Sequence, residues 1–506
     1  MQAGIDLGTG GSKEAVTDPQ GNPCILRNED GDLILPSVVF FEENGNVLFG
    51  KTALSAGSLD PARCVMNAKR YIGTDKVLFT SATGEKYYAK DIQRLLFEKV
   101  REIYSKATGG GTLKKVAVSH PANFTANQIS ETKEAAEAAG LEVLVMVKEP
   151  TAASFGHLLH RQNLVDARVL VIDQGAGTLD VTVLTASGCT IEAKETLGAP
   201  KLGCIDFDDV LVKIVTERWK EKHHGLPDET KDPLFFSDLR GQCERGRIQL
   251  TLRDEAQVML AYSGKSLSAK VTYEEFKRGS KALLAQFKDT VTQAIKEKAY
   301  SFSDFHTILL VGGGSQMRLL QEATEELTGR KPTLDSEPQF TVAKGVYIMG
   351  RIVWEGQGHQ TTDLQNRRLP PVEGRYQETT SHPIGVKVVT KDGRYVNAVI
   401  LEKGKRIPAD YTVQFKLAEP GATSALIELY EGLDNAPIEV CSKLGEFELK
   451  DLTPVYDRDH PVDIRLKLDL NSLLAAEAYD PISSKSAQMQ LTYTKKEGPC
   501  APVPVS

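Results

Sequence analysis

The sequence lacks the features that mark membrane, secreted or nucleic-acid-binding proteins. No segment approaches the roughly 20 apolar residues that a membrane helix requires. No basic stretch followed by an apolar one stands at the start, so we expect no secretory signal. The formal net charge of -7 provides no attraction to nucleic acid or to an acidic membrane. Neither is therefore expected among the partners of this chain.

Paired cysteines are also missing. The seven cysteines are scattered singly, form no C-x-x-C motif and are odd in number. Disulfide frameworks and zinc sites use paired or regularly spaced cysteines. We therefore expect reduced thiols and a cytoplasmic location. The adjacent His223 and His224 lie in a charged segment and are expected to be solvated rather than metal-bound.

What the sequence does contain is an internal duplication. At 506 residues the chain is long enough for two or three domains. AGIDLGTGGSKEAV, from Ala3 to Val16, resembles LVIDQGAGTLDVTVL, from Leu170 to Leu184. Each copy has a short apolar strand, an Asp, a glycine-rich turn with a Thr, and a second strand. The duplication predicts two related α/β lobes that face each other.

Strands and helices are predicted to alternate between the two copies. The expected elements are a strand at Val116–Ser119, a helix capped by Thr125 with Gln128 and ended by Gly140, a strand at Val143–Val147, and a helix with Pro150 at its first position. This alternation is typical of α/β lobes.

The pattern changes after Trp354. Glu355–Thr380 is polar, contains Pro370-Pro371 and shows no helix or strand period, which predicts a linker. Beyond it, apolar and charged residues alternate as in half-buried antiparallel strands, at Phe447 and Leu449 and at Ile464, Leu466, Leu468 and Leu470. This predicts a β-sandwich. The expected divisions are a nucleotide-binding domain at 1–355, a linker at 356–380, the sandwich at 381–495 and a tail at 496–506.

The duplicated turns are suited to a nucleotide. Glycine lets backbone N–H groups approach phosphates closely, and Mg²⁺ is usually held by one or two carboxylates and its own waters. Asp6 and Asp173 end the first strands of the two copies and are expected to hold Mg²⁺ through waters. A single D-x-G-x-G turn is more often a plain hairpin. Two copies in matched contexts favour a phosphate site.

Here the sequence resembles the 70-kilodalton heat-shock chaperones, members of the actin-like ATPase superfamily. The motifs are GIDLGT at Gly4–Thr9, NAKRYIG at Asn67–Gly73, KEPTAA at Lys148–Ala153, DQGAGTLDV at Asp173–Val181, LGCIDFD at Leu202–Asp208, CERGRIQLT at Cys243–Thr251, VGGGS at Val311–Ser315, LYEG at Leu429–Gly432 and LGEFELKDL at Leu444–Leu452. They follow the family order over nearly the whole chain. The resemblance implies a two-lobed actin-like (ribonuclease-H-like) α/β ATPase domain followed by a β-sandwich.

The resemblance also implies a set of site residues. Those implied in catalysis are Asp6, Lys69, Glu149, Asp173 and Thr178. Those implied in nucleotide binding are Gly8, Thr9, Gly10, Gly175, Ala176, Gly177, Asp180, Gly203, Glu244, Arg247, Ile248, Thr251, Gly312, Gly313, Gly314 and Gln316. Lys69 would place its ammonium beside the γ-phosphate. Without the family context, Lys69 could be a solvated surface lysine and Glu149 an exposed turn residue.

Several positions depart from the family pattern. Gly10 and Gly11 replace larger residues, which should loosen the first phosphate turn, and Ala176 adds a methyl group to the second. Ile248 and Gln316 stand where the family has arginines around adenine, so adenine binding should be weaker by the cation–π contribution of about 0.5–2 kcal/mol. The leucine-rich acidic linker is missing, and the chain is expected to end before any helical lid.

The leading functional hypothesis is an ATP-dependent, chaperone-like protein. It would bind ATP with Mg²⁺, hydrolyse it slowly, and couple this cycle to extended or unfolded apolar peptides and to co-chaperones. An alternative is a nucleotide-gated scaffold with little ATP turnover, which the substituted adenine site favours. A third hypothesis, phosphotransfer by a sugar-kinase relative, is disfavoured by the absence of a sugar-site motif and by the added β-domain.

Overall fold

The computed structural model describes residues 2–18, 20–158, 167–187, 190–228, 232–364, 367–372 and 374–490. Contacts among residues divide the chain into two compact units. The first holds the residues up to 122 together with 135–375, and the second holds 123–134 together with the residues from 376 onward. The predicted tail at 496–506 and the predicted end of the sandwich at 495 lie outside the described residues.

The first unit contains two sheets with the same strand arrangement, as the duplication predicts. The five strands that correspond run in the order β11-β10-β1-β2-β3 in one sheet and β18-β17-β12-β13-β14 in the other. The first sheet comprises β1 (Ala3–Leu7), β2 (Gly11–Thr17), β3 (Pro23–Ile25), β10 (Lys115–His120) and β11 (Glu142–Lys148). The second comprises β12 (Ala167–Gln174), β13 (Leu179–Ser187), β14 (Thr190–Ala199), β17 (Thr307–Val311) and β18 (Thr333–Leu334).

The two central strands, β1 and β12, occupy equivalent places. Each forms an antiparallel hairpin with the next strand and a parallel pair with a strand that returns later, β10 or β17. All five residues of β1 and seven of the eight in β12 are buried. Strands buried on both faces are expected to be almost continuously apolar, so a polar residue at their ends needs a reason. Asp6, Asp173 and Gln174 are those residues.

Two helices meet at close range beside these sheets, α4 (Glu149–Leu158) and α10 (Thr341–Gly356). Helix α10 packs on β1, and α4 contacts β12 and β13. A Cβ atom on Gly345 would lie 1.7 Å from the carbonyl oxygen of Ala152, and one on Gly156 would lie 2.3 Å from that of Thr341. Only glycine fits at these two crossings, so the backbones of the helices are in direct contact.

The remaining elements of the first unit surround this core. The helices are α1 (Gly50–Gly57), α2 (Ala89–Ala107), α5 (Cys204–His223), α6 (Pro233–Leu252), α7 (Tyr273–Gly279), α8 (Lys281–Lys296) and α9 (Arg318–Thr328), with 3-10 turns η1 (Pro61–Arg63), η2 (Ala68–Tyr71), η3 (Phe302–Asp304) and η4 (Gly313–Gln316). The short strands are β4 (Leu35–Pro36), β5 (Val38–Phe41), β6 (Val47–Phe49), β7 (Cys64–Met66), β8 (Phe79–Thr80), β9 (Lys86–Tyr87), β15 (Glu255–Tyr262) and β16 (Lys265–Thr272). Trp219, Phe235 and Phe276 fill the apolar core around α5 and α6.

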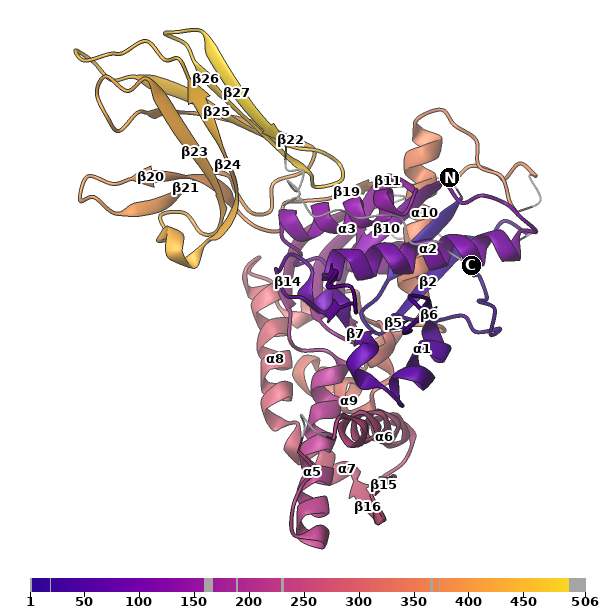
Figure 1. The fold of residues 1–506 in the computed structure, drawn as a ribbon. Helices are drawn as coiled ribbons and strands as arrows, with labels where there is room; N and C mark the ends of the chain where they lie inside the picture. Colours follow the sequence, from indigo (N-terminus) through magenta and orange to yellow (C-terminus); the bar gives the residue numbers. More distant parts are fainter. Residues whose placement is uncertain are drawn as a thin grey trace. The chain divides into compact units, whose positions relative to one another are not determined.

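The second unit is a β-sandwich, as predicted (Figure 1). One sheet has the order β21-β20-β23-β24 and the other β22-β25-β26-β27. Its strands are β20 (Ile384–Val389), β21 (Tyr395–Leu401), β22 (Ala409–Lys416), β23 (Ser424–Glu431), β24 (Ser442–Lys450), β25 (Pro461–Leu468), β26 (Leu474–Asp480) and β27 (Lys485–Gln490), with η5 (Ile438–Val440). Ile464, Leu466 and Leu468 are buried between the sheets. Leu470 lies beyond β25 and is exposed, so the alternation predicted to reach Leu470 ends at Leu468.

The helix α3 (Ala126–Ala138) begins as predicted. The backbone N–H of Gln128 donates to Thr125 Oγ1, and the Gln128 side chain accepts from the Thr125 N–H, which is a reciprocal cap. Gly140 follows the helix with a positive φ of 81°. Helix α4 starts at Glu149, so Pro150 takes its second position rather than the first.

The predicted linker, 356–380, needs correction. Its residues up to 375 belong to the first unit. Thr361 and Leu369 are buried, the Arg351 guanidinium donates to the carbonyl of Pro370, and Glu355 accepts from the N–H of Val372. These bonds to α10 involve backbone atoms of the segment, so hydropathy does not reveal them. The strand β19 (Arg375–Gln377) follows.

Candidate nucleotide-binding site

The two glycine-rich turns that join β1 to β2 and β12 to β13 lie against each other. A Cβ atom on Gly10 would lie 3.0 Å from the Ala176 Cβ, and one on Gly177 would lie 2.8 Å from Thr9 Oγ1. Side chains larger than a hydrogen atom would force the turns apart. The sequence-predicted residues Gly8, Thr9, Gly10, Gly175, Ala176, Gly177 and Thr178 are therefore brought together.

The second turn is fixed by a bond network that sequence reasoning missed. The Arg70 guanidinium donates to the carbonyl of Gly177 at 2.8 Å and to Asp206 Oδ2 at 2.6 Å. The same Asp206 oxygen accepts from the N–H of Gly203 at 2.7 Å. A Cβ on Gly203 would lie 2.2 Å from the Ala176 carbonyl. The start of α5 is thus held against the turn.

Lys69 and Glu149 form a buried ion pair. Lys69 lies on η2, Glu149 begins α4, and Lys69 Nζ donates to Glu149 Oε1 at 2.7 Å. Their side chains are only 7% and 13% exposed. This burial does not fit the alternatives considered above, in which Lys69 is a solvated surface lysine and Glu149 an exposed turn residue. A buried charge requires a partner of opposite sign, and the Lys69 ammonium and the Glu149 carboxylate are partners for each other.

Asp6 has two bonding partners, and neither of them was predicted from the sequence as a site residue. Its Oδ1 accepts from the Ser119 hydroxyl on β10, and its Oδ2 accepts from Lys13 Nζ, each at 2.9 Å. Lys13 is the residue opposite Asp6 in the β1–β2 register. The sequence does predict a hairpin here, and a hairpin pairs residues on either side of its turn. Which residue lies opposite Asp6, however, depends on how many residues the turn takes.

The carboxylates of the site interact strongly. Burial raises the pKa of Asp173 well above its usual value, and Glu149, Asp180 and Asp6 raise it further. Burial also raises the pKa of Glu149, against the opposing effect of Lys69. Burial alone would raise the pKa of Asp6, but the ammonium groups of Lys13 and Lys69 outweigh it and lower that pKa. Burial and the neighbouring carboxylates therefore favour the protonated form of Asp173, and a cation bound beside it would oppose that effect.

This donor set fits a water-shelled Mg²⁺ near Asp173. No group of three or more His, Cys, Asp or Glu side chains poised to ligate a metal directly occurs in the described part of the chain. Mg²⁺ keeps several waters and needs few protein carboxylates, so a direct cage is not required. A Cβ on Gly312 would lie 2.5 Å from Asp173 Oδ1, so only glycine at this position leaves room for the carboxylate. Asp6, by contrast, already has both oxygens bonded.

The base-side residues lie on α6 and η4. Arg247 Nε donates to Asp208 Oδ1 on α5 at 2.6 Å, and burial raises the pKa of Asp208 to about 6 despite this pairing. Ile248 is 54% exposed, and Glu244 is exposed beside it. The Thr251 hydroxyl donates to the backbone of its own helix, at the carbonyl of Arg247.

The η4 loop connects this side to the two glycine turns. Gly312 lies beside Asp173, and a Cβ on Gly314 would lie 2.4 Å from the Gln174 side chain and 2.8 Å from Cys204 Sγ. Gly313 has open space where its Cβ would be. The Gln316 amide donates to Gln339 Oε1 at 3.1 Å. The glycines of the predicted adenosine motif thus lie next to the second turn. The predicted residues on α6 recur every three or four positions and share one side of its C-terminal half, at Glu244, Arg247, Ile248 and Thr251.

Two lobes of like topology with facing glycine turns, followed in the chain by a β-sandwich, define a two-lobed actin-like architecture. A family model described as "Hsp70 protein" matches residues 2–78 and 74–499. The chain is 30% identical over 496 residues to the chaperone protein DnaK of Thermotoga neapolitana, and likewise to those of Thermotoga petrophila and Thermotoga maritima. Each alignment covers 97% of this chain and 80% of the relative. The chain belongs to the Hsp70 family of chaperone-type ATPases.

None of the helices in the described residues combines the length and the apolar character needed to cross a membrane.

Proposed function

We propose that this chain binds ATP with Mg²⁺ in the first unit and hydrolyses it slowly. The observation that carries the proposal is the buried Lys69–Glu149 pair beside two glycine turns in mutual contact. Phosphoryl transfer is accelerated chiefly by positioning and by charges placed near the transferred group. Lys69 would stabilise the developing charge, Glu149 and Asp180 would position water, and Thr9 and Thr178 would contact the γ-phosphate.

The metal and base roles follow the same logic. Asp173 would hold Mg²⁺ through its waters, with Asp6 contributing to the same shell. Mg²⁺ would offset the charge of the phosphates. Glu244, Arg247, Ile248, Thr251 and Gln316 would bind ribose and adenine, and Gly203 and Gly312–Gly314 would line the path between base and phosphates.

The second half of the proposal is that the β-sandwich, extending to about 495, binds extended or unfolded apolar peptides and that co-chaperones act on the cycle. Val389 and Tyr395 lie opposite each other at the tip of the β20–β21 hairpin, and they are 44% and 52% exposed. Leu426 on β23, in the same sheet, is 58% exposed. Exposed apolar side chains on a sheet suit an extended peptide.

ATP turnover measured with and without an extended apolar peptide tests the coupled function. Peptide should stimulate the wild type and leave Lys69→Ala inactive. The exposed Lys86 on β9 supplies a matched control, Lys86→Ala, which should behave as the wild type. Turnover that no peptide changes would reject coupling.

A second candidate function is a nucleotide-gated scaffold with little turnover. The ammonium of Lys13 on Asp6 favours it, because that carboxylate is already neutralised before a metal arrives. Nucleotide binding with turnover no faster in the wild type than in Lys69→Ala would select this candidate.

A further inference from the structure

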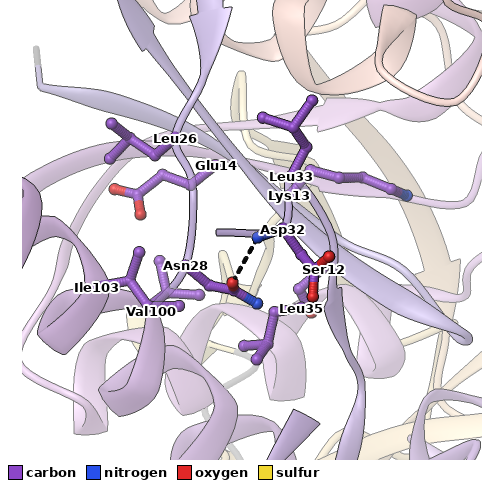
Figure 2. A pocket seen from close by; sticks show the side chains of 10 residues that line it. All are labelled: Ser12, Lys13, Glu14, Leu26, Asn28, Asp32, Leu33, Leu35, Val100 and Ile103. Carbon is purple, nitrogen blue, oxygen red and sulfur yellow. Dashed lines mark hydrogen bonds between the residues drawn. The ribbon is translucent and has the colours of Figure 1, made fainter. Parts of the chain in front are cut away.

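Lys13 places a positive charge inside the candidate phosphate site. Its side chain is only 15% exposed and leaves β2 on the opposite side from that of its neighbour Glu14 (Figure 2). The ammonium forms an ion pair with Asp6 Oδ2 at 2.9 Å. Glu149 and Asp173 are two further carboxylates near enough to attract the same ammonium. The lysine is therefore charged and faces the same carboxylates as the proposed metal.

The position of the ammonium relative to the first turn is also defined. A Cβ built on Gly8 would lie 3.4 Å from Lys13 Nζ. The ammonium thus lies beside the backbone of the turn proposed to bind phosphate. An ammonium has three N–H donors, and Asp6 Oδ2 takes one of them. An oxygen anion at Gly8 would find a cation already in place.

The same arrangement reduces what Asp6 can offer a metal. Its Oδ1 accepts from Ser119 and its Oδ2 accepts from Lys13. Repulsion between a buried ammonium and a divalent cation is strong where solvent screening is weak. A metal would therefore be held from the Asp173 side, with less contribution from Asp6 than a free carboxylate would make.

We propose that Lys13 is a phosphate-binding residue that supplies part of the charge otherwise provided by Mg²⁺, so that nucleotide binding depends only weakly on the metal. The inference rests on the proposed ATP binding. When nucleotide enters, the free N–H groups of Lys13 donate to a phosphate oxygen while the bond to Asp6 keeps the ammonium in position. Charge-assisted hydrogen bonds of this kind are the stronger class.

Calorimetric binding of ADP and of a non-hydrolysable ATP analogue, each with Mg²⁺ and with a chelator, tests the proposal. The wild type should lose less than about tenfold in affinity when Mg²⁺ is removed. Lys13→Met should lose about tenfold more than the wild type does, the size of one charge-assisted hydrogen bond. The control is Lys115→Met, which removes one positive charge from β10 of the same sheet, where Lys115 is 37% exposed. It should match the wild type.

The outcomes separate the two proposals. An equal magnesium dependence in Lys13→Met and the wild type would overturn the role of Lys13 and leave ATP binding standing. A wild type that binds no nucleotide under either condition would overturn both. If Lys13→Met fails to fold because Asp6 loses its partner, the double variant Asp6→Asn/Lys13→Met removes both charges. Wild-type affinity of that folded variant in chelator would also reject the proposal.

Discussion

Lys69 and Glu149 are 80 positions apart in the sequence, yet their charged atoms lie 2.7 Å apart and are largely shielded from water. The pair connects η2, which follows the small sheet of β5, β6 and β7, to the start of α4. A buried pair of this kind contributes little net stability, because desolvation offsets most of the attraction. Its position beside the two glycine turns is the basis of the catalytic role that we propose for it.

Lys69→Ala should remove most ATP hydrolysis and leave nucleotide binding largely intact. Loss of one electrostatic stabiliser typically costs about 10²–10³ in rate. Single-turnover hydrolysis measures the effect on the chemical step. A rate within tenfold of the wild type would remove Lys69 from the proposed role, and Lys86→Ala should have no effect.

Ile248→Arg should tighten ATP binding by up to about 2 kcal/mol, because a guanidinium stacked on adenine adds a cation–π attraction. The exposed position of Ile248 on α6 leaves space for the longer side chain. Calorimetry gives the affinity. Leu234→Arg, at the opposite end of the same helix, adds the same charge to an exposed position and should leave affinity unchanged. An equal gain in both variants would point to general charge attraction instead of stacking.

Glu14→Leu should stabilise the protein, and more so at higher pH. Glu14 on β2 points into a small cavity lined by Leu26, Val100 and Ile103 (Figure 2). Its carboxyl oxygens are buried without a hydrogen-bond partner, and burial raises its pKa well above the usual value. A raised folded-state pKa means that stability is lost as the pH rises from the unfolded pKa through the folded one.

The gain from Glu14→Leu should therefore be small near pH 4.5 and grow toward pH 8 by up to about 1.4 kcal/mol per pH unit until the folded-state pKa is passed. Urea unfolding at several pH values measures it. Glu221→Leu, at an exposed position on α5, is the control and should show no such growth. A gain independent of pH would mean that the Glu14 proton is held equally in both states.

The affinity of the β-sandwich for a peptide should change less than about tenfold, or 1.4 kcal/mol, between ATP and ADP. A ligand shifts a two-state equilibrium only by its differential affinity for the two states. The segment Thr361–Arg368, which leads from α10 toward the β-sandwich, contains Leu364 as its only leucine. Each leucine buried is worth about 1.5–3 kcal/mol, so this segment can bury little apolar surface in one nucleotide state that it exposes in the other. Anisotropy titrations of one peptide in both nucleotides measure the change. A hundredfold difference would contradict the prediction.

The sequence predicts the repeated parts of this molecule well. The duplicated strand–turn–strand segments predict two sheets with the same strand order, since β1 and β12 are recognisable by apolar runs that end in Asp. The Thr125–Gln128 cap and the alternation in β25 also follow from local patterns. These signals are local, and each lies within a few residues of its effect.

Features that depend on distant residues were less predictable. The bond from Arg70 to Asp206 joins residues 136 positions apart, and no periodicity encodes it. Lys13 was missed because its alignment with Asp6 depends on the length of the glycine turn. The segment after α10 was predicted to be a linker because hydropathy does not record backbone bonds such as that of Val372 to Glu355.

The contact between α4 and α10 has a mechanical consequence. Side-chain ridges of one helix normally pack into the grooves of its neighbour, so rotating one helix against the other requires that packing to be broken. At Gly156 and Gly345 no side chain stands between the two helices, and their backbones are in direct contact, so less packing opposes a small rotation. Helix α10 packs on the first sheet and α4 contacts the second, so the contact between these helices links the two sheets of the first unit. A methyl group added at either glycine would clash with a backbone carbonyl and force the two helices apart.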